Sequence, residues 1–221
     1  MKSLFCAALM ATSTLIGTAA YAEDNPWMIR GRVLGVLPDE SGELSVAGAA
    51  LPGNVDIGDQ YVPELDISYF FNKNVAVELI LAVTPHDVEA VNVTVPGALT
   101  NATVDLGDVW LLPPTLTLQY HFAPDAVINP YLGAGVNYTI FFNEDLPAGS
   151  PLLSIDHGDS FGPALQAGVD IKLNDPWFLN LDVKKVFMNT KATMDAGALG
   201  IVKASVDLDP WLFGVGFGRR F

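Results

Sequence analysis

The sequence has little of three things: cysteine, positive charge and long apolar runs. Its single cysteine, Cys6, lies within the first 22 residues, so a disulfide-stapled exported domain is excluded. There are 11 Lys and Arg residues against 25 Asp and Glu residues, giving a formal net charge of −14. A nucleic-acid partner is therefore not expected, because binding phosphates requires basic groups. After Ala22 no apolar run of about 18 residues occurs, so no membrane-spanning helix is expected, although 50% of the residues are hydrophobic.

The first 22 residues have the pattern of a cleaved export signal. Lys2 gives a positive start, residues 4–20 are apolar or small, and Ala20-Tyr21-Ala22 fits a small-residue cleavage site. A membrane anchor is the alternative, but the apolar stretch is shorter than a membrane span requires. Cys6 precedes the apolar region rather than following it, which argues against a lipoprotein. We predict a signal peptide over residues 1–22 and a single domain over residues 23–221.

Hydrophobic residues at every second position follow the signal peptide in eight segments of barrel-strand length. In residues 61–71, for example, Leu65, Ile67 and Tyr69 lie on one face, whereas Glu64 and Asp66 lie on the other. The eight segments are residues 27–37, 61–71, 75–85, 110–122, 129–142, 161–173, 177–189 and 207–221. We therefore predict an all-β fold, an eight-stranded antiparallel up-and-down transmembrane β-barrel.

The connections between these segments alternate between long and short, as in barrels with long outer loops and tight periplasmic turns. Residues 38–60, 86–109, 143–160 and 190–206 are the predicted outer loops, which places both termini in the periplasm. A soluble β-sandwich has the same alternation. It does not require apolar residues in phase with one another up to a C-terminal phenylalanine, as found at Phe213, Val215, Phe217 and Phe221. We expect the barrel-assembly machinery to recognise Phe221. The predicted location is the outer membrane of a Gram-negative bacterium, with lipid and lipopolysaccharide around the barrel.

The inward face of the predicted barrel divides into two levels. Ten charged residues are expected to form a polar plug at and below mid-barrel: Arg30, Arg32, Glu64, Asp66, Glu78, Asp170, Lys172, Asp182, Lys184 and Arg220. Opposite charges are balanced in this set, as burial demands. Nearer the outside the same face turns apolar, at Leu34, Val36, Val62, Ile80, Ala82, Phe141, Val186, Met188 and Leu212. This apolar level is predicted to be the path of small hydrophobic solutes, because water-filled porins are polar throughout.

Several alternatives remain open at this stage. Side chains could fill the upper level completely, because eight strands enclose little space. The acidic outer loops could act as a surface receptor or adhesin. Ser154, His157 and Asp159 share one loop and would suit a lipid-modifying enzyme only if they converged in space. His86, His121 and His157 fall on different elements, so neither a metal site nor a cofactor is expected, and the chain is not predicted to be an enzyme.

Several stretches of the sequence together resemble the OmpW family of outer-membrane barrels. They are LPPTLTLQYHF (112–122), PYLGAGVNYT (130–139), ALQAGVD (164–170), NLDVKK (180–185) and Asp209-Pro210-Trp211. The resemblance covers most of the chain outside the long loops. It implies an eight-stranded barrel with a hydrophobic channel that admits small apolar compounds, alkanes among them, and releases them sideways toward the bilayer. The sequence departs from the family pattern at Thr84-Pro85-His86-Asp87 and at Arg219.

Overall fold

The structure, a computed structural model, describes residues 25–46, 49–95, 97, 99–150, 152–197 and 200–221. The predicted signal peptide lies outside these residues. None of the described residues forms a helix that could cross a membrane. The strands are β1 (Trp27–Leu37), β2 (Ser41–Val46), β3 (Ala49–Leu51), β4 (Asn54–Ile57), β5 (Gln60–Phe70), β6 (Val75–Ala82), β7 (Thr84–Val95), β8 (Leu99–Leu112), β9 (Thr115–His121), β10 (Ile128–Asp145), β11 (Ser154–His157), β12 (Ser160–Asn174), β13 (Trp177–Val186), β14 (Asn189–Asp195), β15 (Ile201–Asp207) and β16 (Trp211–Arg220).

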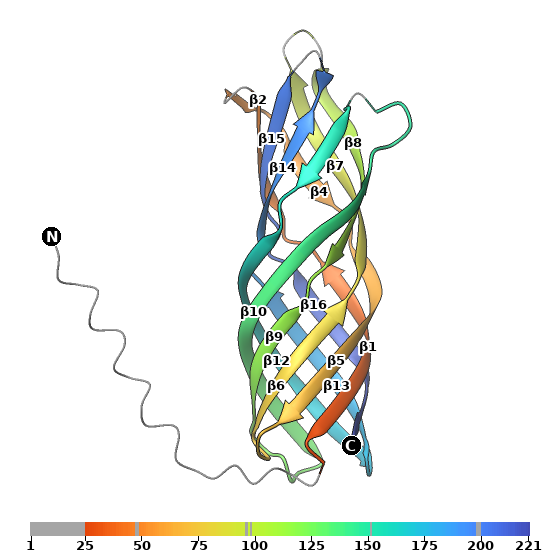
Figure 1. The fold of residues 1–221 in the computed structure, drawn as a ribbon, viewed down its shortest axis with the longest axis vertical. Coiled ribbons are helices and arrows are strands. Elements are labelled where there is room, and N and C mark those ends of the chain that lie inside the picture. Colours follow the sequence, from red (N-terminus) through yellow and green to blue (C-terminus); the bar gives the residue numbers. More distant parts are fainter. Residues whose placement is uncertain (1–24, 47–48, 96, 98, 151, 198–199) are drawn as a thin grey trace, which may run out of the picture.

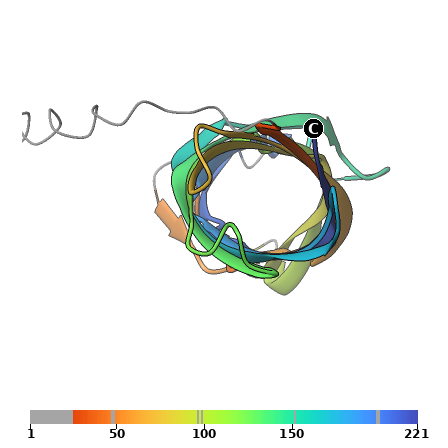
Figure 2. The same ribbon diagram turned by 90° about the horizontal axis from the view of Figure 1, so that it is seen from below.

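Eight of these strands form a closed antiparallel barrel. Their order is β1, β5, β6, β9, β10, β12, β13 and β16, and β16 pairs with β1 to complete the ring. Figure 1 shows the tilted strands from the side, and Figure 2 shows the ring from the end that carries the C-terminus. Closure leaves no unpaired strand edge in this ring, which a bilayer requires. The predicted eight-stranded antiparallel barrel is confirmed.

The alternation read from the sequence places apolar side chains outside and polar ones inside the barrel. In β5, Leu65 is exposed, whereas its neighbours Glu64 and Asp66 are buried in the lumen. Aromatic pairs lie at the two ends of the ring, with Trp27 against Tyr69 at one end and Trp211 against Phe213 at the other. Such girdles are typical of barrel surfaces at the two membrane interfaces.

The prediction that residues 38–60, 86–109, 143–160 and 190–206 are outer loops is largely wrong. Much of these ranges forms strands that continue the barrel beyond the aromatic girdle, in two groups (Figure 1). One group contains β4, β7, β8 and the end of β10, and the other contains β11, β14, β15, β2 and β3. The alternation continues here, since Val88 and Ala90 are buried and Glu89 between them is exposed. The acidic outward positions resemble loop composition, and this hid the strand pattern.

Several predicted strands are interrupted where the barrel meets this outer extension. Residues 75–85 divide at Val83 into β6 and β7, and residues 110–122 divide at Pro113-Pro114 into β8 and β9. Proline cannot donate to a strand ladder, which accounts for the second break. β6 pairs with β9 as far as Ile80 opposite Thr115, and β7 pairs with β8 from Thr84 opposite Leu111. Between these two ladders, residues 81–83 and 112–114 show no ladder pairing with each other among the described residues, although Leu81 and Ala82 still pair with β5 and Leu112 with β10.

Candidate functional site: an apolar cavity above a polar network

A network of buried charges fills the lower lumen. Arg30 donates to Glu78 at 2.6 Å and to Asp170 at 2.8 Å. Arg32 forms ion pairs with Glu64, Glu78 and Asp182 at 2.8–3.3 Å, and also with Asp66. Each of these side chains is almost completely inaccessible to solvent. Buried charges are tolerated only when they are paired, so the balance of charge in the sequence corresponds to direct contacts.

Lys184 closes the top of this network. Its ammonium group lies 2.9 Å from Glu64 Oε1 and 3.0 Å from Asp182 Oδ1, and its side chain is only 2% exposed. One oxygen of Glu64, Oε1, therefore contacts two cationic groups, since Arg32 Nε also lies 2.8 Å from it. The result is a layer of ion pairs across the lumen at the level where the inward face turns apolar.

One of the ten predicted plug residues, Lys172, lies elsewhere. Lys172 is not part of the network, because its side chain is 46% exposed and pairs with Asp175 at 3.1 Å. The regular ladder between β12 and β13 shifts register between Lys172 and Asn174, at the mouth of the barrel, so this side chain reaches solvent. Arg220 does lie within the predicted level, at the lower end of the lumen, where its guanidinium group stacks 4.1 Å from the centre of the Phe70 ring.

Uncharged residues that were not predicted as plug members complete the network. Tyr131 donates to Asp182 at 2.6 Å, Gln166 donates to Glu78 at 3.0 Å, and Ser68 donates to Glu78 at 2.9 Å. All three lie at inward positions on their strands. Counting charges alone missed them, although the alternation that found Asp170 and Asp66 also points Gln166 and Ser68 inward.

Above this network lies an apolar cavity. The space in it that the centres of water-sized molecules can occupy is about 80 Å³, and the cavity is partly open to the exterior. Side chains therefore do not fill the upper level of the lumen completely, which was the alternative prediction. The polar residues at its lower end are Glu64, Lys184, Thr115 and Asn137, whereas most of its wall is aliphatic.

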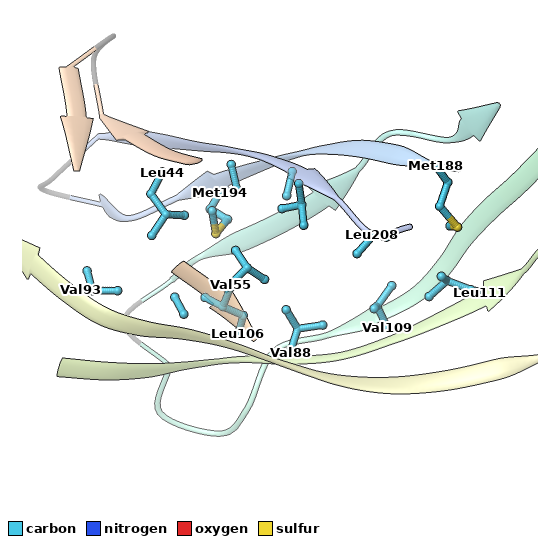
Figure 3. Packing of buried hydrophobic residues seen from close by; sticks show 14 of the residues in the cluster. Leu44, Val55, Val88, Val93, Leu106, Val109, Leu111, Met188, Met194 and Leu208 are labelled. Atoms are coloured by element: carbon cyan, nitrogen blue, oxygen red, sulfur yellow. The ribbon is translucent and has the colours of Figure 1, made fainter. Parts of the chain in front are cut away.

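Eight of the nine predicted apolar residues line this cavity: Leu34, Val36, Ile80, Ala82, Phe141, Val186, Met188 and Leu212. Val62 is buried but does not line it, because it packs in the wall against the cluster formed by Leu34, Val36 and Ala82. The cavity extends much further outward than predicted. Its upper wall contains Val55, Val88, Leu106, Val109, Leu111, Ala192, Met194, Ala204, Val206 and Leu208, most of which are contributed by the outer strands, and many of them are drawn in Figure 3.

Two histidines of the outer strands also line the cavity. His86 Nδ1 lies 3.2 Å from the Gly58 carbonyl, and burial lowers the pKa of this imidazole. The His157 ring stacks on Phe141 with 5.6 Å between centroids, and its Nδ1 lies 3.1 Å from Glu144 Oε1. Neither histidine was assigned to the cavity from the sequence. His86 lies where the sequence departs from the family pattern, and His157 lies in a predicted loop.

The candidate hydrolytic residues do not converge. His157 is joined to Glu144, Asp159 accepts a hydrogen bond from Tyr138, and Ser154 is paired with Asp195 across β11 and β14. Within the described residues no group of three or more His, Cys, Asp or Glu side chains is placed to hold a metal ion.

Comparisons with known proteins agree with this architecture. The OmpW family model matches residues 24–221. An uncharacterised outer-membrane protein of Sinorhizobium fredii, y4mB, is 44% identical over 198 residues, which cover 89% of this chain and 80% of that protein. The dibenzothiophene metabolism operon protein PahQ of Pseudomonas aeruginosa is 33% identical, with 93% of both chains covered. The crystal structure of the outer-membrane protein OprG from Pseudomonas aeruginosa superposes with a TM-score of 0.81 at 33% identity, covering 89% of this chain and 96% of that chain. The chain belongs to the OmpW family and is an outer-membrane β-barrel.

Proposed function

We propose that this barrel takes small hydrophobic molecules from outside the cell into its apolar cavity and releases them sideways toward the bilayer. The observation that carries the proposal is the sharp change along the lumen: an apolar cavity stands directly on a filled network of ion pairs. An apolar cavity with few polar groups selects apolar ligands. The name of the relative PahQ, which refers to dibenzothiophene metabolism, is in keeping with a hydrophobic aromatic solute.

The filled lower lumen argues against straight passage to the periplasm. Arg30, Glu78 and Asp66 are wholly buried there, and an apolar molecule would have to separate them without replacing their hydrogen bonds. A sideways exit has a candidate position at the interruption formed by Val83 and Pro113-Pro114. Pro113 lines the cavity, while Val83 is exposed on the outer surface of the barrel.

Charged substitutions in the cavity test the uptake proposal. Ile80→Asp introduces a carboxylate into the cavity wall, which should retain water and abolish uptake of a small apolar solute while the barrel still assembles. Leu165→Asp is the control, because Leu165 is exposed on the lipid face, where a charge weakens the barrel itself. Normal uptake by a correctly assembled Ile80→Asp protein would remove the proposal and favour a surface receptor that acts through its acidic exterior.

Photo-crosslinking tests the exit. A photoreactive residue in place of Val83 should capture solute added from outside more efficiently than one in place of Val33. Both side chains are exposed outward, and Val33 is paired with Pro63 in an uninterrupted part of the wall. Equal capture at the two positions would contradict release at this interruption.

We further propose that Phe221 acts as the signal for the barrel-assembly machinery, with both termini in the periplasm and lipid or lipopolysaccharide against the apolar outer face. Phe221 is exposed, and its backbone pairs with Trp27, so its ring is available on the surface while its main chain closes the barrel. Deleting Phe221 should reduce insertion into the outer membrane while export across the inner membrane continues. Surface levels equal to those of the unchanged protein would contradict this assignment.

A further inference from the structure

At the floor of the apolar cavity, the contacts made by the described residues leave a hydrogen-bond acceptor and a hydrogen-bond donor unused. Lys184 and Glu64 both line the cavity, and their side chains are at most 2% exposed. In the described part of the chain, both recorded contacts of the Glu64 carboxylate, with Lys184 and Arg32, are made by Oε1. No recorded contact reaches Oε2, although a carboxylate oxygen accepts hydrogen bonds readily.

Lys184 is incompletely used in the same way. An ammonium group has three N–H donors. Within the described residues Lys184 donates to Glu64 Oε1 at 2.9 Å and lies 3.0 Å from Asp182 Oδ1 as an ion pair, which leaves at least one donor. The register of the barrel places Lys184 opposite Leu212 and Glu64 opposite Ala82, two residues of the apolar wall. The unused donor and acceptor therefore lie at the boundary between the ion pairs and the cavity.

We propose that this floor recognises a hydroxyl group, so that the preferred ligand is a small apolar alcohol or phenol held with its polar end toward Glu64 and Lys184. A hydroxyl is both a donor and an acceptor, so it can donate to Glu64 Oε2 and accept from Lys184 Nζ at once. A hydrocarbon leaves both groups unsatisfied, and an ether can use only the donor of Lys184. A carboxylate ligand would meet the negative charge of Glu64. The proposal rests on the proposed function and names the substrate class of the same cavity.

A set of matched ligands tests this preference on the unchanged protein in nanodiscs. The probes are 2-methylnaphthalene, 2-methoxynaphthalene and 2-naphthol, and each dissociation constant is corrected for partition into empty nanodiscs. We expect 2-naphthol to bind about tenfold more tightly than 2-methoxynaphthalene, a factor that corresponds to about 1.4 kcal/mol. The 15N signal of the Lys184 ammonium group should move when 2-naphthol is added and stay in place when 2-methylnaphthalene is added.

The outcomes separate this inference from the proposed function. If the hydrocarbon and the ether bind but the phenol has no advantage over the ether, the hydroxyl site is wrong and the hydrophobic cavity stands. If none of the three probes binds, both proposals fail. A tenfold advantage without a change in the Lys184 signal would also overturn the site, because the selectivity would then arise elsewhere.

Adjacent lysines on β13 offer a matched pair of variants. Lys184→Met should reduce the advantage of 2-naphthol to about threefold or less, since the donor at the floor is lost while Arg32 still pairs with Glu64 and Asp182. Lys185→Met should leave the advantage unchanged, because Lys185 faces outward against the Trp211 ring. Equal advantages in the two variants would contradict the proposal. The ligand set on the unchanged protein decides the question even if Lys184→Met fails to assemble.

Discussion

The lower and upper halves of this barrel are built by the same alternation of side chains but have opposite interiors. In the lower half, large polar residues such as Arg30, Tyr131 and Gln119 are buried and fill the lumen. In the upper half, the inward positions hold aliphatic residues, several of them as small as Ala192 and Ala204, and a cavity remains. Strand geometry fixes which residues point inward, and their size and polarity then decide whether the lumen is closed or hollow.

The two halves also differ in what holds them together. Each charged group in the lower network depends on partners from several strands, so Arg30 on β1 joins Glu78 on β6 and Asp170 on β12. The upper half consists of two strand groups whose apolar faces pack across the cavity (Figure 3). Losing one partner should therefore be costly below, whereas changes of volume above should alter binding more than stability.

The largest loss of folding stability is expected from Arg30→Leu. The substitution leaves Glu78 and Asp170 buried without this cation, and removing one partner of a buried pair costs about 3–5 kcal/mol. The barrel should unfold at a lower temperature, which the loss of its heat-modifiable mobility on a gel would report.

Arg219→Leu is the matched control for this substitution. The Arg219 side chain lies on the outer surface against the Trp177 and Phe221 rings, at 5.6 and 4.8 Å from their centres. Its loss should cost about 1 kcal/mol or less, as expected for an exposed cation–π contact. If the two variants unfold at the same temperature, the lower network does not stabilise the barrel more than a surface contact does.

Much of the lower half could be predicted from the sequence. The period of two identified the eight membrane strands, and it placed Arg30, Glu64 and Asp182 inside because a charge on the lipid face is unfavourable. Which cation pairs with which anion could not be read, since those pairs depend on the stagger between strands far apart in the chain. Lys172 was misplaced for a related reason: alternation alone does not show where the lumen ends and solvent begins.

The upper half was predicted less well, because strands were expected to end where the membrane ends. The inward residues Val88, Ala90 and Val109 alternate with acidic residues, which suit solvent and not lipid. Outward acidity was therefore interpreted as loop composition, although it is equally compatible with a strand that stands in water. The size of the cavity depends on these outer strands and could not be estimated without them.

Filling the cavity should affect binding more than stability. Ala204 is buried in the wall opposite Ala192 in the strand register, so Ala204→Trp places a large ring into the open space. Affinity for a small apolar solute should fall about tenfold or more, whereas the free energy of unfolding should change by about 1–3 kcal/mol at most, the usual cost of overpacking. Lys203→Trp, at the adjacent outward position, is the control for adding a ring. Unchanged affinity in a folded Ala204→Trp protein would show that solutes bind elsewhere.

The smallest expected effect is a change in the pKa of one carboxyl on the acidic exterior of the upper half, where Asp108 faces Asp87 across β7 and β8. A hydrogen bond with Asp87 is the main cause that raises the pKa of the Asp108 carboxyl above its usual value, and the negative charges of Asp87, Asp105 and Asp145 add to it. A carboxyl whose pKa is raised by folding favours the folded state below its unfolded pKa, and this contribution is lost as the pH rises through the raised value. Asp87→Asn should therefore lower the pKa of Asp108, as measured by carboxyl 13C titration. Glu89→Gln, the next outward position on β7, should leave it unchanged. Because this pair is exposed, salt should weaken the part of the pKa shift that comes from charge.

Affinity for an apolar solute should not change with pH over the range in which Asp108 titrates. If solute binding did titrate together with Asp108, the acidic exterior would take part in uptake, and the two faces of the upper wall would not be independent.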